Sequence, residues 1–598
     1  MSLKPVKGRK LNLERIFVGD IEAENWVQNF VLGGYYDGSN YYLFDKIDDM
    51  IEFILSKEKK NPVVYFHNLS YDCLFILEYL IKKNYDFRIV KAGSYVYQIK
   101  VRRSFKSKNC VYFRDSYVLL RSSLNEASKI FLNDTKEEFD YDKDFLNREK
   151  LESYLKKDLY LLYNVLIKFF EAVDFVNSIS LSSLSLIKFR QSLSSEIYYK
   201  VNNSLDAYGR NFYFGGRCEI FKFYGKNINV YDFNSMYPFV MSNFEYPYGK
   251  SYFVYKRNYH RIGFYKVRLK FRYDDYITPL VIKGSKLYFV NNDVFDNVYF
   301  LNSYELDLLE EEGYYNYEII EGIEFEKKGF IFKDYINDLY NKRIEAKKSN
   351  NRVLDYVMKL MLNSLYGKFG QTRVKKTYIT EYQVDYLYNR IRSIEDKEKR
   401  EKMLIELRNK LTYLGNNIYS YEVGLNFAEY LNVFISALTT SLARIHLYKF
   451  LKKYQENIYY CDTDSIFVDC EISKEYVDNF ALGKLKFEKK FSQVYFLLPK
   501  FYSYVDSGGN KGSVAKGFKR FVDIDEIFNF LSGGILKDEY IEPASFLESL
   551  RNISYIKEKY SATRAIKKIE KYIRSLYDKR KIVNDNDTYP FGYSEIII

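Results

Sequence analysis

The sequence predicts a multidomain α/β protein, and three observations support this class. The chain has 598 residues, too many for one hydrophobic core and enough for about four domain-sized units. Runs rich in β-branched and aromatic residues, such as 15–19 and 63–66, predict buried strands, and the helical periodicity of 151–169 predicts a long helix. Two further strand-like runs within 457–469 flank a short acidic turn and predict a hairpin.

The tip of the predicted hairpin carries two aspartates, Asp462 and Asp464. Like charges this close repel each other, whereas an Asn-Gly or Asp-Gly pair would form an ordinary hairpin turn. A divalent cation would explain the pair, because Mg²⁺ binds one or two protein carboxylates and keeps its other positions for water and substrate phosphates. Asp232, which ends the alternating run 227–231, is the third carboxylate we expect there. A solvated acidic turn is the alternative for the hairpin considered alone.

Four acidic residues in the N-terminal third predict a second metal site. Asp20 and Glu22 continue a strand and lie on one face of it, because side chains alternate along a strand. Asp72 lies where the strand 63–66 leads into an apolar helix, and Tyr154 and Asp158 share a helix face at spacing i, i+4. Such carboxylates can hold two metal ions for in-line phosphodiester hydrolysis, with Tyr154 orienting the attacking water. Ordinary surface acids are the alternative for each piece alone.

A predicted helix over 351–369, ended by Gly370, presents a mixed polar face. Four residues fall on that face at helical spacing, and they are Lys359, Asn363, Tyr366 and Gly367. A cation suits a triphosphate, a ring suits base or sugar stacking, and glycine admits close approach. Positive charge is added upstream by Arg343, Lys347 and Lys348. A solvated face is the alternative for some of these residues.

The composition favours a nucleic-acid partner. The formal net charge is +13, and the chain holds 64 tyrosines and 48 phenylalanines. Basic and aromatic residues together suit phosphate contact combined with base stacking. An AT-rich genome would produce the same composition, so this observation only raises the expectation. We also expect His67, Asn68 and Tyr71 to contact nucleic acid, although a lone histidine is more often a hydrogen-bonded packing residue.

The sequence predicts a soluble protein of the cytoplasm. It contains no run approaching the roughly 20 apolar residues of a membrane span, and it does not begin with a signal peptide. Its five cysteines are scattered without a Cys-x-x-Cys pair, which argues against a disulfide framework and against a zinc site. We therefore expect a reducing compartment and no membrane partner.

Six segments, in order, closely resemble the motifs of family B DNA polymerases. Three resemble the palm and fingers motifs, and they are 232–238 (Asp-Phe-Asn-Ser-Met-Tyr-Pro), 359–367 (Lys-Leu-Met-Leu-Asn-Ser-Leu-Tyr-Gly) and 460–465 (Tyr-Cys-Asp-Thr-Asp-Ser). Three resemble the proofreading motifs, and they are Asp20 with Glu22, 67–72 (His-Asn-Leu-Ser-Tyr-Asp) and 154–158 (Tyr-Leu-Lys-Lys-Asp). Agreement of six ordered segments by accident would be rare, so the joint match is specific.

Within this family, the chain resembles the protein-primed branch of bacteriophages and linear plasmids. The interval from Asp232 to Lys359 is long enough for an insertion that this branch carries. Four more segments resemble branch motifs, and they are Tyr213-Phe214-Gly215-Gly216, Lys136-Glu137-Glu138-Phe139, Thr440 with Ala443 and Arg444, and Lys500-Phe501-Tyr502. The chain departs from the branch at Ser116, which is followed by tyrosine instead of leucine, and in its longer, charged second insertion.

The resemblance implies a ribonuclease-H-like 3′–5′ exonuclease domain followed by a right-hand polymerase with palm, fingers, thumb and two insertions. The expected boundaries are 1–180 for the exonuclease domain, 181–243 for a linker and the first part of the palm, 244–333 for insertion 1, 334–373 for the fingers, 374–420 for insertion 2, 421–505 for the rest of the palm and 506–598 for the thumb. We expect a helical arm at 386–411. We also expect a basic amphipathic helix at 546–581, for which a solvated face is the alternative to a duplex-holding thumb.

The resemblance also implies roles for individual residues. In the polymerase site it implies metal binding by Asp232, Asp464 and the Phe233 carbonyl, support by Asp462, and nucleotide contacts by Tyr237, Lys347, Lys359, Asn363 and Tyr366. In the exonuclease site it implies metal binding by Asp20, Glu22, Asp72 and Asp158, with Tyr154 and Lys136 as catalytic partners. The implied DNA contacts are His67, Asn68, Tyr71, Ser116, Tyr213, Gly215, Gly216, Gly367, Thr440, Arg444, Lys500 and Tyr502.

The function implied by the resemblance is template-directed DNA synthesis with proofreading, on a linear viral or plasmid genome, by protein-primed initiation and strand displacement. Two Mg²⁺ ions per active site are implied, with Mn²⁺ as a substitute. The implied partners are primer-template DNA, deoxynucleoside triphosphates (dNTPs), a terminal protein as primer, and single-stranded and double-stranded DNA-binding replication proteins. We expect a monomer. The alternatives are a family B polymerase that extends nucleic-acid primers and a catalytically inactive DNA-binding scaffold.

Overall fold

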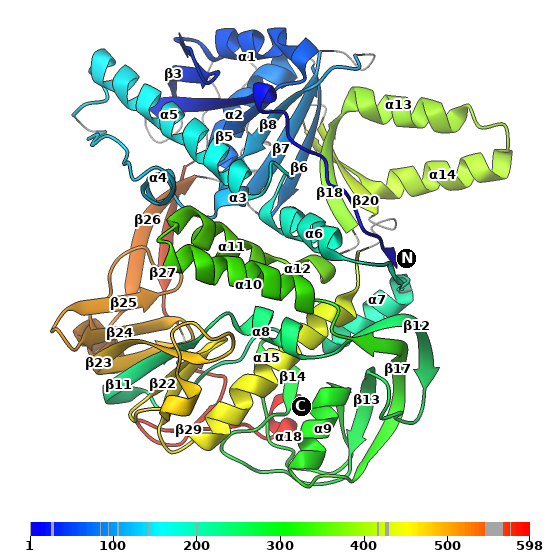
Figure 1. Ribbon diagram of the computed structural model, residues 1–598, viewed down its shortest axis with the longest axis vertical. Helices are drawn as coiled ribbons and strands as arrows, with labels where there is room; N and C mark the ends of the chain where they lie inside the picture. Colours follow the sequence, from blue (N-terminus) through cyan, green and yellow to red (C-terminus); the bar gives the residue numbers. More distant parts are fainter. Residues whose placement is uncertain are drawn as a thin grey trace.

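The structure is a computed structural model that describes residues 2–24, 29–83, 85–93, 95–103, 107–141, 143–198, 201–372, 374–415, 418–424, 430–543, 566–574 and 576–597. Within these residues, two large sheets lie at opposite ends of the molecule (Figure 1). None of the described helices is both long and apolar enough to cross a membrane.

A ten-stranded sheet in the order β19-β20-β18-β6-β7-β8-β5-β2-β3-β4 forms the upper part of Figure 1. The first two predicted strands are confirmed as β2 (Ile16–Glu24) and β5 (Val63–Phe66), which are parallel neighbours with Val18 opposite Tyr65. The other strands from the N-terminal part of the chain are β3 (Asn29–Tyr36), β4 (Tyr41–Phe44), β6 (Asp86–Ala92), β7 (Tyr95–Arg102) and β8 (Val111–Asp115).

Helices cover both faces of this sheet, and the alternation along β2 decides which side chains meet which helix. Phe17 and Ile21 pack into the core that holds α1 (Ile47–Ser56) and α2 (Leu69–Lys82). Ile16 and Val18 pack into the core that holds α5 (Arg148–Ala172), which is the predicted long helix. Asp20 and Glu22 have the same parity as Val18, so they face α5.

The second predicted insertion extends this same sheet. Its strands are β18 (Val374–Thr380), β19 (Leu411–Gly415) and β20 (Ile418–Gly424). Strand β18 pairs with β6, and the Thr377 hydroxyl donates to the Ile89 carbonyl oxygen at 2.8 Å. The predicted helical arm is confirmed as α13 (Glu381–Arg392) and α14 (Lys397–Lys410), which project from the sheet as a helical hairpin (Figure 1).

A seven-stranded sheet in the order β10-β21-β22-β11-β23-β24-β25 forms part of the lower half of the molecule. The predicted hairpin is confirmed as β21 (Ile458–Asp462) and β22 (Ser465–Val468), and Thr463 in its two-residue turn has φ 64°. The neighbouring strands are β10 (Cys218–Ile220), β11 (Tyr224–Phe233), β23 (Leu485–Leu498), β24 (Phe501–Asp506) and β25 (Lys511–Ala515).

Helices between the two sheets carry the mixed polar face. The pair α10 (Lys333–Lys348) and α11 (Arg352–Ser364) packs against α8 (Met236–Asn243) and α6 (Leu181–Ser192). The prediction of one continuous helix over 351–369 is wrong at Leu365, because a separate short helix, α12 (Tyr366–Phe369), follows α11. The Ser436 hydroxyl of α15 (Val433–Lys453) donates to the Tyr366 carbonyl oxygen at 2.6 Å, which ties α12 to α15.

The interval between Asp232 and α10 contains a small sheet in the order β12-β17-β13-β16. Its elements are β12 (Tyr246–Val254), β13 (Gly263–Leu269), β16 (Asn297–Asn302), β17 (Tyr317–Gly329) and the helix α9 (Ser303–Glu311). A further hairpin pairs β14 (Val281–Lys283) with β15 (Leu287–Phe289).

The prediction of a helix over 546–581 is wrong for its described part. Residues 566–572 form β27 (Ile566–Tyr572), which pairs with β26 (Lys537–Pro543). The strand obtains its backbone partners from β26, and an ion pair joins Lys568 to Glu539 at 3.1 Å. Residues 546–565 and residue 575 of this prediction lie outside the described residues.

Candidate active sites

Three of the four acids predicted in the N-terminal third lie together. One carboxylate oxygen each from Asp20, Glu22 and Asp158 lies within 4.8 Å of the others. Strand β2 supplies the first two, and α5 supplies Asp158 from across the sheet surface. Asp158 and Glu22 are 2% and 6% exposed, so this negative charge is concentrated where little water reaches it.

Burial and mutual repulsion make these carboxyl groups weak acids. Burial raises the pKa of Asp20 to about 7, and the charge of Asp158 adds to the shift. Burial raises the pKa of Glu22 to about 8, with further contributions from Asp20 and Asp158. Burial also raises the pKa of Asp158, although the neighbouring Lys136 ammonium opposes that shift.

Lys136, for which the resemblance implies a catalytic role, lies directly at this cluster. Its Nζ is 2.5 Å from Oδ2 of Asp158 and 4.7 Å from the ring centre of Tyr154. Burial alone would lower the pKa of Lys136, but the charge and hydrogen bond of Asp158 together with Asp20 and Tyr141 outweigh it, and the pKa is raised. The lysine therefore stays positively charged.

Aromatic rings border the cluster and include one residue that the sequence analysis missed. Tyr154 stacks on Phe139 with ring centres 4.6 Å apart. Tyr141 is the missed residue, and its hydroxyl donates to Oε2 of Glu22 at 3.3 Å. It follows the Lys-Glu-Glu-Phe segment by two residues, so extending that motif would have found it.

The remaining residues predicted for this site lie at the start of α2. Asp72 is 1% exposed and is not part of the group of three acids that lie together. Asn68 has φ 67°, and its N–H donates to Oδ1 of Asp115 at 2.9 Å. Nδ1 of His67 is 2.9 Å from the Ser116 hydroxyl. Burial lowers the pKa of His67 to about 4, so this imidazole is neutral near pH 7.

The second site lies on the seven-stranded sheet, where β11 meets the hairpin turn. Asp232 is paired with Ser465, and the Phe233 N–H donates to the Asp464 carbonyl oxygen at 2.8 Å. Burial raises the pKa of Asp232 to about 7, with a further contribution from Asp464. Burial likewise raises the pKa of Asp464 to about 6. The backbone pairing thus holds two partly buried carboxylates side by side.

The other aspartate of the hairpin has a different partner. Nζ of Lys500 is 2.7 and 2.8 Å from the two carboxylate oxygens of Asp462. Asp462 is therefore neutralised by a lysine, whereas Asp464 faces Asp232. Lys500 was predicted to contact DNA, and in this structure its ammonium is held by the hairpin.

A group of basic residues surrounds Asp232 and Asp464. The charge of Lys359 from α11 partly offsets the rise in the pKa of both acids, and Lys486 from β23 partly offsets the rise for Asp232. Burial lowers the pKa of Lys347 on α10, and the nearby cations Arg343, Lys486 and Lys359 lower it further. Sequence reasoning missed Lys486 because only the pairing of β23 with β11 brings it to the site, opposite Asp232.

Two tyrosines form a surface next to these acids. The rings of Tyr237 on α8 and Tyr366 on α12 have centres 4.3 Å apart. Burial raises the pKa of both hydroxyls, and the charge of Asp464 contributes in each case. Asn363 shares α11 with Lys359. Gly367 has no other atom within 4 Å of the place where a Cβ would lie, so space is open above it.

The predicted linker motif contacts the hairpin turn directly. A Cβ on Gly216 would lie 2.8 Å from the Thr463 side chain, so only glycine fits there without displacement. Arg444 donates to the carbonyl oxygens of Phe214 and Gly215 at 3.2 and 3.1 Å. Tyr213 lies at the other end of the motif, where its ring would meet a Cβ on Gly370 at 2.7 Å.

Two predicted DNA contacts lie in the protein interior. Thr440 is 3% exposed, and its hydroxyl donates to the Ser436 and Ala437 carbonyl oxygens of its own helix. Tyr502 is 8% exposed and packs against Tyr460 and Phe496.

The donor chemistry of both sites fits a hard divalent cation. Oxygen ligands suit Mg²⁺, and a bound cation would offset the repulsion that raises the carboxyl pKa values. The N-terminal cluster offers three carboxylates, and the seven-stranded sheet offers Asp232 and Asp464. Each group could hold divalent ions.

Comparisons with known proteins show which sequences this chain resembles. A family model described as DNA polymerase type B, organellar and viral, matches residues 55–148 and 143–457. A probable DNA polymerase of Ascobolus immersus is 27% identical over 97% of this chain and 52% of that protein. The DNA polymerase of Bacillus phage phi29 is 26% identical over 78% of this chain and 81% of that protein. The chain thus spans about half the length of the first fungal relative.

The phi29 DNA polymerase also resembles this chain in structure. Its complex with primer-template DNA and incoming nucleotide substrates matches with a TM-score of 0.72 at 20% identity, over 94% of this chain and 100% of that chain. The free phi29 enzyme matches with a TM-score of 0.68. This likeness confirms the predicted fold class, an exonuclease-type domain followed by a right-hand arrangement.

Proposed function

The chain belongs to the type B DNA polymerases of organelles and viruses, and on this premise we propose that it copies DNA at one site and degrades DNA from the 3′ end at another. The observation that carries the proposal is the environment of Asp232 and Asp464. Two carboxylates beside the cations Lys359, Lys347 and Lys486 are suited to an ion-bridged triphosphate.

At the polymerase site, Asp232, Asp464 and the Phe233 carbonyl would hold Mg²⁺, with Mn²⁺ as a substitute. When bound there, two such ions would supply the charge that activates a hydroxyl nucleophile and stabilises the leaving pyrophosphate. Lys359 and Lys347 would neutralise the triphosphate from α11 and α10. Asp462, which is neutralised by Lys500, would support the turn and leave metal binding to Asp464.

The tyrosine pair would select and place the nucleotide. The rings of Tyr237 and Tyr366 lie against each other beside Asp464. A ring at this position would exclude a ribose 2′-hydroxyl, so the substrates would be dNTPs. Asn363 and the open space above Gly367 would accommodate the sugar and the nascent base pair.

The second activity would be 3′–5′ exonuclease proofreading. Asp20, Glu22 and Asp158 would hold the metal ions, with Asp72 joining them when substrate is bound. Tyr154 would orient the attacking water, and the Lys136 ammonium would stabilise negative charge at the phosphate. The nearby side chains of His67, Asn68, Tyr71 and Ser116 would contact the single strand.

We further propose protein-primed replication of a linear viral or plasmid genome with strand displacement. The small sheet of insertion 1 would contact a terminal protein that supplies a hydroxyl primer. The helical hairpin of insertion 2 would enclose the template. Primer-template DNA would be held at Tyr213, Gly215, Gly216 and Lys500, and the buried Thr440, Arg444 and Tyr502 would support these groups from the interior. Single-stranded and double-stranded DNA-binding proteins would assist a monomeric enzyme.

A 5′-labelled primer on a longer template tests both activities in one gel. With Mg²⁺, we expect extension when dNTPs are present and shortening when they are absent. Shortening in both lanes would overturn the polymerase proposal. No change in either lane would favour the alternative of a catalytically inactive DNA-binding scaffold. Initiation without a terminal protein would favour the alternative, a polymerase that uses nucleic-acid primers.

A further inference from the structure

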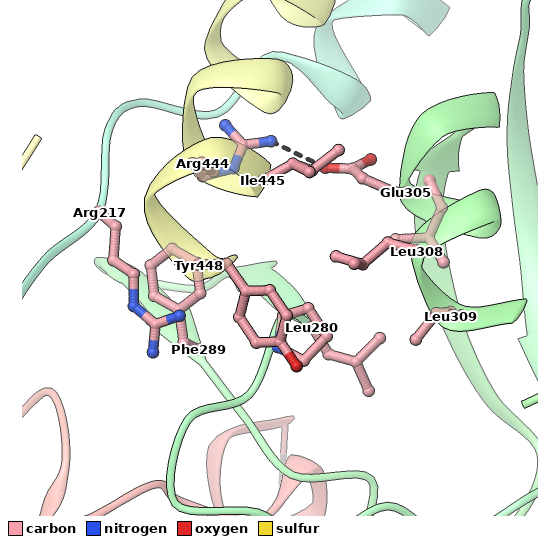
Figure 2. A pocket seen from close by; sticks show the side chains of 11 residues that line it. Arg217, Leu280, Phe289, Glu305, Leu308, Leu309, Arg444, Ile445 and Tyr448 are labelled. Atoms are coloured by element: carbon pink, nitrogen blue, oxygen red, sulfur yellow. Dashed lines mark hydrogen bonds and ion pairs between the residues drawn. The ribbon is translucent and has the colours of Figure 1, made fainter. Parts of the chain in front are cut away.

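Arg217, which follows the linker glycines, is a buried arginine that the proposed mechanism does not use. It is 1% exposed and lies at the start of β10, the strand that pairs with β21 of the hairpin. Its guanidinium lines a small internal pocket between α15, α9 and the β14–β15 hairpin, together with Arg444 and Tyr448 (Figure 2). Burying a charged group costs free energy, so the buried guanidinium of Arg217 needs a structural or functional reason.

The backbone of this residue holds the hairpin turn. The Thr463 N–H, between the two aspartates, donates to the Arg217 carbonyl oxygen at 2.7 Å. The preceding Gly216 lies against the Thr463 side chain. The position of Arg217 therefore determines where the turn that carries Asp464 can lie.

The side chain of Arg217 is fixed on three sides. Its Nε donates to Oε2 of Glu219 at 2.6 Å, and Nη1 donates to the Thr278 carbonyl oxygen at 2.8 Å. The guanidinium carbon lies 4.1 Å from the ring centre of Phe289. Thr278 and Phe289 belong to insertion 1, so this arginine joins that insertion to the polymerase turn.

Glu219 extends the connection to the C-terminal segment. Its Oε1 is 3.8 Å from Nη1 of Arg580, which is fully buried. Arg580 donates to the Thr588 hydroxyl and to the Tyr276 carbonyl oxygen, both at 3.0 Å. Thr588 in turn donates to the Ile220 carbonyl oxygen of β10 at 2.8 Å.

We propose that Arg217, clamped between Glu219 and insertion 1, is a positioning residue that sets the place of the Asp464 turn. This inference rests on the proposed polymerase function. Lysine cannot reproduce the clamp, because it lacks the planar fork that reaches Glu219 and the Thr278 carbonyl at once. Small displacements of reacting groups are costly, and a shift of about 1 Å can reduce a rate about 100-fold.

The test compares Arg217→Lys with a matched control, Arg257→Lys. Arg257 is also buried and paired with two acids, Asp307 and Glu310, but these partners lie in α9 and not at the turn. For Arg217→Lys we expect kcat for primer extension to fall about 10- to 100-fold, with KM for dNTPs changed less. The exonuclease rate on single-stranded DNA should stay within about twofold in both variants.

A second readout follows the turn directly, without catalysis. Amide exchange of peptides covering 458–468 should be faster in Arg217→Lys, because the backbone carbonyl of residue 217 that accepts from the Thr463 N–H is no longer held in place by the clamp. Exchange in 63–66 should not change, and Arg257→Lys should leave both regions as in the wild type. If Arg217→Lys fails to fold, Glu219→Gln takes its place in the test. It keeps the shape of the clamp but removes its charge, and it should also make amide exchange at the turn faster.

The outcomes separate this inference from the proposed function. Selective loss of extension with faster exchange at the turn supports the positioning role. Unchanged extension and exchange, or equal loss of both activities with a lower melting temperature, overturns it. A wild-type protein that extends no primer refutes the proposed function, and the exchange comparison then still decides whether Arg217 holds the turn.

Discussion

Lys500 and Asp462 form an ion pair in which Nζ lies 2.7 Å from Oδ1 and 2.8 Å from Oδ2. The pair separates the two aspartates of the hairpin into different electrostatic environments. Burial raises the pKa of Asp464, the charge of Asp462 raises it further and Lys500 opposes this, while Asp464 in turn raises the pKa of Asp232. Two acids that are two residues apart in sequence are therefore expected to differ in function.

The first prediction concerns this difference. Asp462→Asn should reduce primer extension by about 10- to 100-fold, the usual range for a residue that supports metal ligands. Asp464→Asn should reduce it much further, because Asp464 would be a ligand itself. Single-turnover extension rates check the order. Equal losses would contradict the separate environments that we infer from the ion pair.

The second prediction concerns pH and stability. Folding raises the pKa of Asp20 from 3.8 to about 7 and that of Glu22 from 4.5 to about 8. The unfolded state ionises first, so the metal-free exonuclease domain should lose stability as the pH rises from about 4 to 8. Asp20→Asn removes one of these charges. It should raise the melting temperature in EDTA, more at pH 8 than at pH 5.

The control for this prediction is the divalent cation. Mg²⁺ should stabilise the wild type at pH 8 more than the Asp20→Asn variant, because it binds the native carboxylates. A calorimetric scan measures both effects, with about 2–4 °C expected for each kcal/mol. A lower melting temperature for Asp20→Asn in EDTA would show that the cluster does not destabilise the fold.

The third prediction concerns Lys136. Its pKa is raised by Asp158 despite burial, so the ammonium should persist across the working pH range. Lys136→Met should reduce exonuclease rates by about 100-fold, as for loss of one charge-stabilising donor, while extension continues. Lys150→Met is the matched control, because Lys150 is an exposed lysine in the first turn of α5 that pairs with Asp144, a residue before the helix. Its exonuclease rate should remain that of the wild type.

The fourth prediction concerns sugar selection. Tyr237→Val removes the ring that lies 4.3 Å from that of Tyr366 and opens space beside Asp464. The ratio of kcat/KM for dNTPs to that for ribonucleotides should fall by about 10- to 100-fold, the range for loss of a steric contact. Tyr237→Phe keeps the ring and should retain the selectivity. Unchanged selectivity in Tyr237→Val would assign the exclusion to another group.

Local periodicity was sufficient to predict much of the site. Alternation along β2 predicts that Asp20 and Glu22 share a face, and the i, i+4 spacing predicts that Tyr154 and Asp158 do so on α5. The acidic tip of the hairpin likewise identifies Asp464 as a candidate ligand from its immediate neighbours in the chain. In each case the relevant geometry is fixed within a few residues.

Tertiary neighbours could not be predicted in the same way. Lys486 reaches Asp232 only through the register of β23 against β11, and Tyr141 reaches Glu22 only through the folding of a loop. The Thr377 hydroxyl donates to the Ile89 carbonyl oxygen 288 residues away, which places insertion 2 on the ten-stranded sheet. No local pattern encodes such pairings. The helix predicted over 546–581 was wrong at 566–572 for the same reason, because β26 supplies a strand partner there.

The most direct test of two independent sites uses one 5′-labelled primer-template with Mg²⁺ and three proteins: the wild type, Asp464→Asn and Asp20→Asn. We predict that the wild type extends the primer with dNTPs and shortens it without them. Asp464→Asn should only shorten it, and Asp20→Asn should only extend it. Equal loss of both activities in each variant would contradict the assignment of polymerisation to the hairpin acids and degradation to the β2 acids.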